Sequence, residues 1–168
     1  ARQAIAALGL DPAALAQSAA NLGHARAALN AALMPMLDRA QARHGALLLD
    51  RAGFDAAPGE QRRRLIVAAV RFVTGAGYPP RRAGVDHALA ALARGARVTL
   101  DGAVLDPGAA LLIHREAAGA ERASLAGEVW DNRWRISGLR AGDSVAALGA
   151  DAPAADWRAA GLTHLEAQ

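Results

Sequence analysis

Eight arginines lie within residues 62–97, a stretch that holds one acidic residue, Asp86. A guanidinium group presents its N–H donors in a fixed planar array that matches the oxygens of a phosphate. The flanking segments differ in charge, because residues 1–61 are neutral overall and residues 98–168 have a net charge of −4. This pattern indicates the binding of an anionic partner at one place on the surface.

Within this arginine block, the stretch TGAGYPPRR joins two apolar patterns. Pro79 and Pro80 fix the backbone that leads into the next helix, so Arg81 and Arg82 are expected at its start, where backbone N–H groups already favour an anion. Tyr78 has a ring that stacks on bases, although packing against the preceding helix is the commoner role. The candidate nucleic-acid contacts are Arg62, Arg63, Arg64, Arg71, Tyr78, Arg81, Arg82, Arg94 and Arg97.

A purely compositional origin of the block is the alternative. All 19 basic residues of the chain are arginine, which is typical of a GC-rich genome. A solvated helix face would then look the same in the sequence. Arg115 and Arg122, which lie among acids outside the block, are the natural comparison for any test of the block.

No catalytic constellation is recognisable in the sequence. The chain has no P-loop, no dinucleotide-binding glycine motif, no nucleophile elbow and no cysteine, so thiol chemistry and disulfides are excluded. His114 and Glu116 are two residues apart on an expected strand, a pair that metal ions use, but a solvated strand face is the more frequent cause. We predict no catalytic residue, and no metal or cofactor site in this chain.

A long helix is expected to open the chain. Asp11 is a suitable N-cap and Pro12 fits the first helical position, while Gly45 is a plausible end. Pro35 should kink or split the helix. Apolar residues seven apart form a narrow seam that suits one partner helix or domain. The seam consists of Leu15, Leu22, Leu29 and Met36, with Ala19, Leu33 and Ala40 as companions.

Two further helices are predicted over residues 60–74 and 81–94, and they carry most of the arginine block. Phe72 is placed on the buried face of the first of them. Between the long helix and these two, residues 45–50 are predicted to form a short strand and residues 51–59 a loop.

The period of the sequence changes after residue 96. Asp101-Gly102 is a strong hairpin signal, and a second turn follows at residues 106–108. Another hairpin is expected about Asp131-Asn132, with Trp130 and Trp134 on one face, where core packing is a commoner role than base stacking. A strand near 144–147 and a helix near 154–160 are weaker expectations. The sequence therefore predicts an α+β fold in which helices precede a small antiparallel sheet.

No apolar run is long enough to span a membrane and no signal peptide is recognisable, so no membrane partner is expected. The absence of cysteine fits a cytoplasmic setting, which is the expected localisation.

The order of these motifs resembles the region after the catalytic domain in bacterial tRNA(Ile)-lysidine synthases. Residues 62–116 contain the family's sequence of features, and residues 129–136 resemble a W-D-G-R-W/F segment of alphaproteobacterial members, with Asn132 in place of the glycine. The long helix from residue 8 resembles the one that leaves the catalytic domain, so the resemblance covers residues 8–140. The matched features are Arg64, YPPR at 78–81, TLDG at 99–102 and RE at 115–116.

This resemblance implies a non-catalytic, tRNA-binding part of an enzyme that uses ATP to join lysine to the wobble cytidine of an isoleucine tRNA. The S-G-G-x-D-S loop of the adenylating domain is absent here. ATP and Mg²⁺ are thus expected for the parent protein and not for this chain. The implied organisation is a linker helix region at 1–45, a small α+β tRNA-binding domain at 46–140 and a tail or further segment at 141–168.

The expected partners are tRNA and the catalytic domain that is not in this chain. Two alternatives stay open at this point. The chain could be a helical scaffold that dimerises through residues 15–40, with an incidental arginine block. An independent enzyme is the other alternative, which the missing motifs disfavour.

Overall fold

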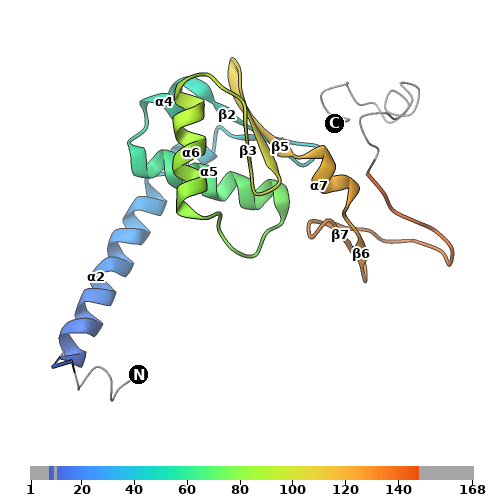
Figure 1. Cartoon of the computed structure of the whole chain (residues 1–168). Helices are drawn as coiled ribbons and strands as arrows, with labels where there is room; N and C mark the ends of the chain where they lie inside the picture. The colour runs from blue at the N-terminus through green and yellow to red at the C-terminus, as the bar shows by residue number, and fades with distance from the viewer. Residues whose placement is uncertain (1–7, 10, 148–168) are drawn as a thin grey trace. The chain divides into compact units, whose positions relative to one another are not determined.

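The computed structural model describes residues 8, 9 and 11–147. The chain forms two compact units, residues 1–35 and residues 36–168. The α+β class predicted from the sequence is confirmed, since a long N-terminal helix and two further helices accompany a small antiparallel sheet (Figure 1).

The first unit contains helix α2, Pro12–Ala31. Its N-cap is Asp11, as predicted, and the carboxylate accepts hydrogen bonds from the Ala13 and Ala14 N–H groups at 2.9 and 3.3 Å. The expected continuation to Gly45 is wrong. Pro35 has no N–H to donate to the carbonyl oxygen of Ala31, four residues earlier, and in a continuous helix its ring would clash with that carbonyl group. Helix α2 therefore ends at Ala31. A separate short helix α3 follows at Met34–Leu37.

The second unit is built on a five-stranded antiparallel sheet. Its strand order is β1-β2-β5-β4-β3. The bounds are Gln41–Arg43 for β1, Ala46–Asp50 for β2, Val98–Leu100 for β3, Ala103–Pro107 for β4 and Ala110–Arg115 for β5. Strand β2 and the hairpin at Asp101-Gly102 were predicted. Strand β1 replaces the end of the expected long helix, because His44 and Gly45 adopt positive φ angles of 48° and 81° and turn the chain back on itself.

The predicted loop at residues 51–59 is also corrected by the structure. Residues Arg51–Ala56 form helix α4, and the Asp50 side chain caps it by accepting from the Gly53 N–H at 3.0 Å. Phe54 is buried in the core with 2 % of its surface exposed. This helix was not predicted because its N-cap, Asp50, is also the last residue of the preceding strand β2, so no loop separates the two elements.

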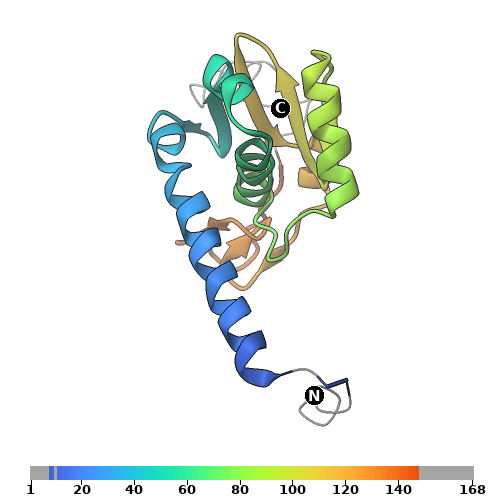
Figure 2. The ribbon, with the colours of Figure 1, turned by 90° about the vertical axis from the view of Figure 1, so that its left-hand side faces the viewer.

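Helices α5, Gly59–Thr74, and α6, Arg82–Ala93, match the predicted helices and pack on one face of the sheet. Figure 2 shows α6 alongside the strands and α5 nearly end-on. The shared core is aliphatic. It includes Leu65, Ile66, Val70, Val73, Val85, Leu92, Leu105, Leu111 and Ile113, each at most 1 % exposed.

Phe72 is an exception to the predicted pattern, since 51 % of its surface is exposed. The buried stripe of α5 is centred on Ala69 and Val73, and Phe72 projects beyond its edge.

The rest of the described chain forms helix α7, Ala117–Glu121, and a small sheet of order β6-β7-β8. Its strands are Leu125–Ala126, Val129–Trp130 and Trp134–Arg135. The predicted hairpin about Asp131-Asn132 is confirmed, with φ angles of 49° and 55° at the turn. Trp130 and Trp134 are cross-strand partners, but both are partly exposed, so they are not core residues. Residues 144–147, predicted as a strand, have no regular structure, and the helix expected near 154–160 lies outside the described residues.

Candidate nucleic-acid interface

The arginines at the start of α5 are held by one carboxylate. Arg63 donates two hydrogen bonds to Glu60, both 2.7 Å long, and Arg64 donates a third, also 2.7 Å. The Arg63 hydrogen bond is the main reason why the pKa of Glu60 falls from 4.5 to about 2. Arg62, Arg63 and Arg64 are all partly buried. This end of the arginine block is therefore partly neutralised before any ligand arrives.

Arg71, near the end of α5, organises the loop that follows. Its Nε donates to the Ala76 carbonyl oxygen at 3.2 Å, and its Nη2 donates to the Gly77 carbonyl oxygen at 3.1 Å. Gly75 ends the helix with a φ of 66°, and the Thr74 hydroxyl accepts from the Ala76 N–H at 3.3 Å. These bonds fix the backbone of residues 75–77, directly before Tyr78.

Tyr78 is the most exposed large side chain of the loop, with 88 % of its surface in solvent. Packing against α5, the commoner role of such a ring, is therefore wrong for this residue. Pro80 is buried behind it, while Pro79 is exposed. The ring is presented outward by a loop whose two ends are anchored.

Arg81 and Arg82 follow at the start of α6. Arg81 is the N-cap residue, Arg82 is the first helical residue, and both are exposed. No side chain caps this helix, so its first N–H groups keep their capacity to bind an anion. Arg82 has a long contact of 3.5 Å with Asp86, and within residues 8, 9 and 11–147 no ion pair involves Arg81.

The last two arginines of the block lie beyond α6. Arg94 is the exposed C-cap of the helix. Arg97 is exposed as well and faces Asp106 across β3 and β4 at 3.8 Å. An exposed pair at this distance contributes roughly 0–1 kcal/mol, so an incoming phosphate can displace it.

A second arginine site, which the sequence did not reveal, surrounds Asp131. The carboxylate is 2 % exposed and accepts hydrogen bonds from Arg115 at 2.9, 3.0 and 3.2 Å and from Arg133 at 3.2 Å. Burial lowers the pKa of the Arg133 guanidinium, and the nearby Asp131 charge opposes this shift. The sequence signals were the Asp-Asn turn and the two family-like segments that contain Arg115 and Arg133, and none of them indicated that Arg115 would reach Asp131 from another strand.

These arginines also bind backbone carbonyl groups of the large sheet. Arg115 Nη1 donates to Gly102 at 2.8 Å, and Arg133 Nη1 donates to Gly45 at 3.1 Å. The Arg133 guanidinium carbon lies 5.3 Å from the centre of the Trp134 ring. The site therefore joins the β7–β8 hairpin to two turns of the large sheet. Arg115 is unsuitable as an exposed control for the arginine block.

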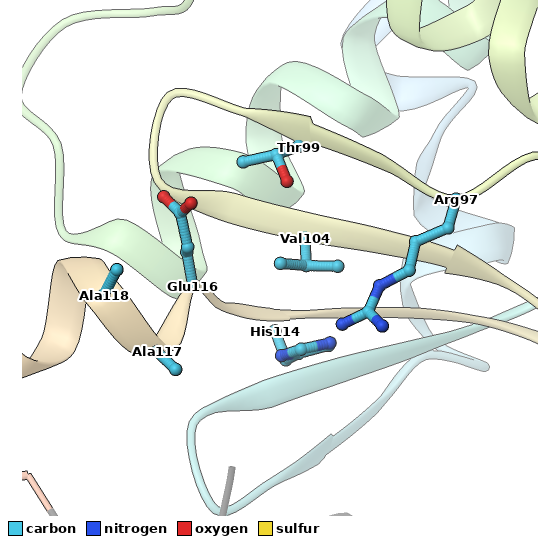
Figure 3. A pocket seen from close by; sticks show the side chains of 7 residues that line it. All are labelled: Arg97, Thr99, Val104, His114, Glu116, Ala117 and Ala118. Carbon is cyan, nitrogen blue, oxygen red and sulfur yellow. The ribbon is translucent and has the colours of Figure 1, made fainter. Parts of the chain in front are cut away.

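A cleft of roughly 330 Å³ opens on the face of the sheet that α5 and α6 do not cover (Figure 3). We call it the sheet cleft; it is lined by Arg97, Thr99, Val104, His114, Glu116, Ala117 and Ala118. The predicted neighbours His114 and Glu116 thus meet Arg97, the last residue of the arginine block.

No cluster of three or more His, Cys, Asp or Glu residues suited to a metal ion occurs among the described residues. None of the described helices is long and apolar enough to cross a membrane.

The chain is 36 % identical over 173 aligned positions to a tRNA(Ile)-lysidine synthase of Ruegeria pomeroyi, and the match covers 98 % of this chain. It spans 41 % of the length of that relative. No protein-family model matches the chain, and no solved structure matches it either. The resemblance predicted from the motifs is confirmed: nearly the whole chain is similar to part of a tRNA(Ile)-lysidine synthase.

Proposed function

We propose that this chain is a tRNA-binding part of a tRNA(Ile)-lysidine synthase and has no ligase activity of its own. The observation that carries the proposal is the anchored loop before α6, which presents Tyr78 to solvent directly before two exposed arginines at an uncapped helix start. We call Tyr78, Arg81 and Arg82 the loop surface. The relative's name supports tRNA as the nucleic acid.

The chemistry of the loop surface suits RNA. An exposed ring stacks on an unpaired base, and such a stack contributes about 1–3 kcal/mol. Arginines beside it contact the flanking phosphates, and the N–H groups of the helix start add a further anion site. Phosphate contacts orient the RNA without reading its sequence.

Binding of a tRNA(Ile) transcript at several salt concentrations tests this proposal. Changing Arg81 and Arg82 together to alanine should reduce the slope of log K against log salt by about 1–2, since each phosphate contact contributes roughly 0.7–0.9. The matched control changes Arg122 and Arg140, which are exposed and lie outside the block. An equal reduction of the salt slope in the control pair would show that the slope reflects only the overall positive charge of the chain, and it would reject the loop surface as a binding site.

The joining of lysine to tRNA, with its ATP and Mg²⁺, belongs in this proposal to the remainder of the longer protein. The pure chain should then release no AMP in the presence of lysine, ATP and tRNA. Lysine-dependent AMP release by this chain would overturn its non-catalytic assignment.

A second candidate function is a scaffold that associates through α2. That helix buries none of its residues, and Leu15 and Leu22 are 41 % and 72 % exposed. Sedimentation equilibrium on the chain and on a Leu15→Gln, Leu22→Gln variant separates the two functions. A dimer that the variant abolishes, together with no measurable tRNA binding, would favour the scaffold.

A further inference from the structure

The sheet cleft is built from one cross-strand row. Thr99 pairs with Val104 in the register of β3 and β4, and Val104 pairs with His114 in the register of β4 and β5. Since side chains alternate along a strand, all three point to the face opposite Leu100, Leu105 and Ile113, which pack under the helices. The floor of the cleft is therefore the apolar side chain of Val104, with a hydroxyl on one side and an imidazole on the other (Figure 3).

The two ends of the cleft carry opposite charges. Arg97 lies at one end, on the row of Asp106 and Leu112, and Glu116 lies four residues further along the β5 direction. Four strand residues span roughly 13 Å, which is comparable with one nucleotide from its phosphate to the far edge of its base. Glu116 is partly buried, and its carboxylate makes no hydrogen bond or ion pair with any part of the chain that the structure describes.

His114 adds a polar atom of defined role between these ends. Its Nδ1 lies 3.1 Å from the Arg115 carbonyl oxygen. A carbonyl oxygen only accepts, so this contact requires the proton on Nδ1, and in that tautomer Nε2 is an acceptor. An acceptor beside the Thr99 hydroxyl suits the 2′-hydroxyl of a ribose, the group that distinguishes RNA from DNA.

We propose that the sheet cleft binds one unpaired guanosine nucleotide of RNA, with its phosphate on Arg97 and its base edge on Glu116. The Glu116 carboxylate repels the phosphates of RNA, and hydrogen bonds from the donors of a base would offset this repulsion. Guanine offers two adjacent donors, N1–H and the N2 amino group, to the two oxygens of one carboxylate. Cytosine and adenine offer one amino group each, and uracil offers one N–H, so they bind less well.

This proposal rests on the proposed RNA-binding function and extends it from phosphate contacts to a base preference. Arg97 connects the two, because it belongs to the arginine block and lines the cleft. The cleft is at the small end of the range of ligand pockets, about 300–1,000 Å³, which suits a ligand of the size of a single nucleotide.

The test titrates the whole 168-residue chain with guanosine 5′-monophosphate, its 2′-deoxy form, adenosine 5′-monophosphate and free lysine, while NMR follows the amide signals of Thr99, Val104 and His114. Guanosine monophosphate should shift these signals at a concentration about tenfold lower than the adenosine compound, the usual discrimination of one bidentate base contact. The deoxy form should bind less tightly. Single-stranded UUGUU and UUAUU show whether RNA or only a free nucleotide is recognised.

Two variants and one control test whether the base contacts Glu116 and the phosphate contacts Arg97. Glu116→Gln should abolish the preference for guanosine over adenosine, whereas Arg97→Gln should weaken every nucleotide about equally. Glu128→Gln removes an exposed carboxylate that pairs with Arg135 at 3.2 Å, away from the cleft, and should change neither.

The proposal is overturned if no nucleotide shifts the cleft signals, if the guanosine preference survives Glu116→Gln, or if lysine causes larger shifts than guanosine monophosphate. A failure of the loop surface is recognisable separately. If changing Arg81 and Arg82 leaves tRNA binding intact while guanosine monophosphate still binds the cleft, only the loop surface is rejected. A free nucleotide that binds while UUGUU does not would reject recognition within RNA.

Discussion

The loop that leads into α6 and the turn of the β7–β8 hairpin both carry arginines, but the environments of these arginines are opposite. At the loop, Arg81 and Arg82 are exposed, and the one carboxylate contact is 3.5 Å long. At the turn, Arg115 and Arg133 share the buried Asp131. The same residue type therefore displays charge in one place and joins two sheets in the other.

The difference follows from where the hydrogen-bond acceptors lie. Asp131 and the carbonyl groups of Gly45 and Gly102 surround the guanidinium groups at the turn. In the loop, the carbonyl oxygens of Ala76 and Gly77 accept from Arg71, and no hydrogen bond of the Arg81 or Arg82 side chain occurs among the described residues. The local density of arginines in the sequence does not by itself indicate a binding surface, because buried acceptors bind some of the guanidinium groups and make them unavailable to a ligand.

The largest effect is expected at the hairpin turn. Asp131→Asn keeps the shape and tolerates the positive φ of 49°, but it removes the charge that two partly buried guanidinium groups share. Breaking a buried pair in this way should lower the free energy of unfolding by about 3 kcal/mol. Urea denaturation measures this loss, with the exposed Asp143→Asn as control. If Asp131→Asn changes the free energy of unfolding as little as the control does, the arginines at the turn do not stabilise the fold, and the proposed difference between the turn and the loop is wrong.

The loop should respond in binding and not in stability. Tyr78→Ala removes an exposed ring, so the free energy of unfolding should change by less than about 0.5 kcal/mol. Loss of one base stack should weaken binding of a tRNA(Ile) transcript by roughly tenfold. Tyr78→Phe is the matched variant, because it keeps the ring. Equal losses in both variants would point to the hydroxyl group instead of stacking.

The start of α5 is intermediate between the two regions, and Glu60→Gln tests this. The substitution removes the negative charge that Arg63 and Arg64 share. If these arginines lie along the path of the RNA, tRNA binding should tighten about threefold, and the slope of log K against log salt should steepen by roughly 1. Unchanged binding would confine the interface to the loop surface and would exclude Arg63 and Arg64 from it.

The smallest effect concerns acid stability. The pKa of Glu60 is lowered to about 2, mainly by the Arg63 hydrogen bond, so the folded state holds this proton less tightly than the unfolded state. Its contribution to stability is complete above the ordinary value of 4.5 and is lost as pH falls toward about 2. Since Glu60 is 39 % exposed, solvent screening limits the contribution to about 1 kcal/mol or less.

Urea denaturation of the wild type and of Glu60→Gln near pH 6 and near pH 2.5 checks the sign. The difference between the two proteins should be larger at the higher pH. A difference that grows on acidification would contradict the assignment of the Glu60 pKa.

Local patterns in the chain were sufficient to predict α5, α6, the N-cap at Asp11 and both hairpin turns. Each depends on a few neighbouring residues: the apolar stripe of α5, the Asp101-Gly102 pair with φ angles of 46° and 81°, and the proline that starts α2. Short-range sterics and hydrogen bonds determine such features, so they can be read without the fold.

The arginine block was visible in the same way, and so was the i,i+4 spacing that pairs Glu60 with Arg64 on α5. The exposure of Arg81 was not, because the burial of a side chain depends on segments that are remote in the chain. Strand β1 and helix α4 were missed for a related reason. The β1–β2 turn is held by Arg133 from 88 residues away, and Phe54 joins a core made by later segments.

Contacts between distant residues also form the arginine site around Asp131 and the sheet cleft, and the sequence predicted neither of them. Arg115 and Asp131 lie 16 residues apart and meet because β5 and the β7–β8 turn converge. Arg97 and Glu116 reach one cleft because β3, β4 and β5 pair in a single register. Side-chain type and spacing decide which elements form, whereas burial and strand pairing decide which charges remain available to a ligand, because both depend on residues that are remote in the chain.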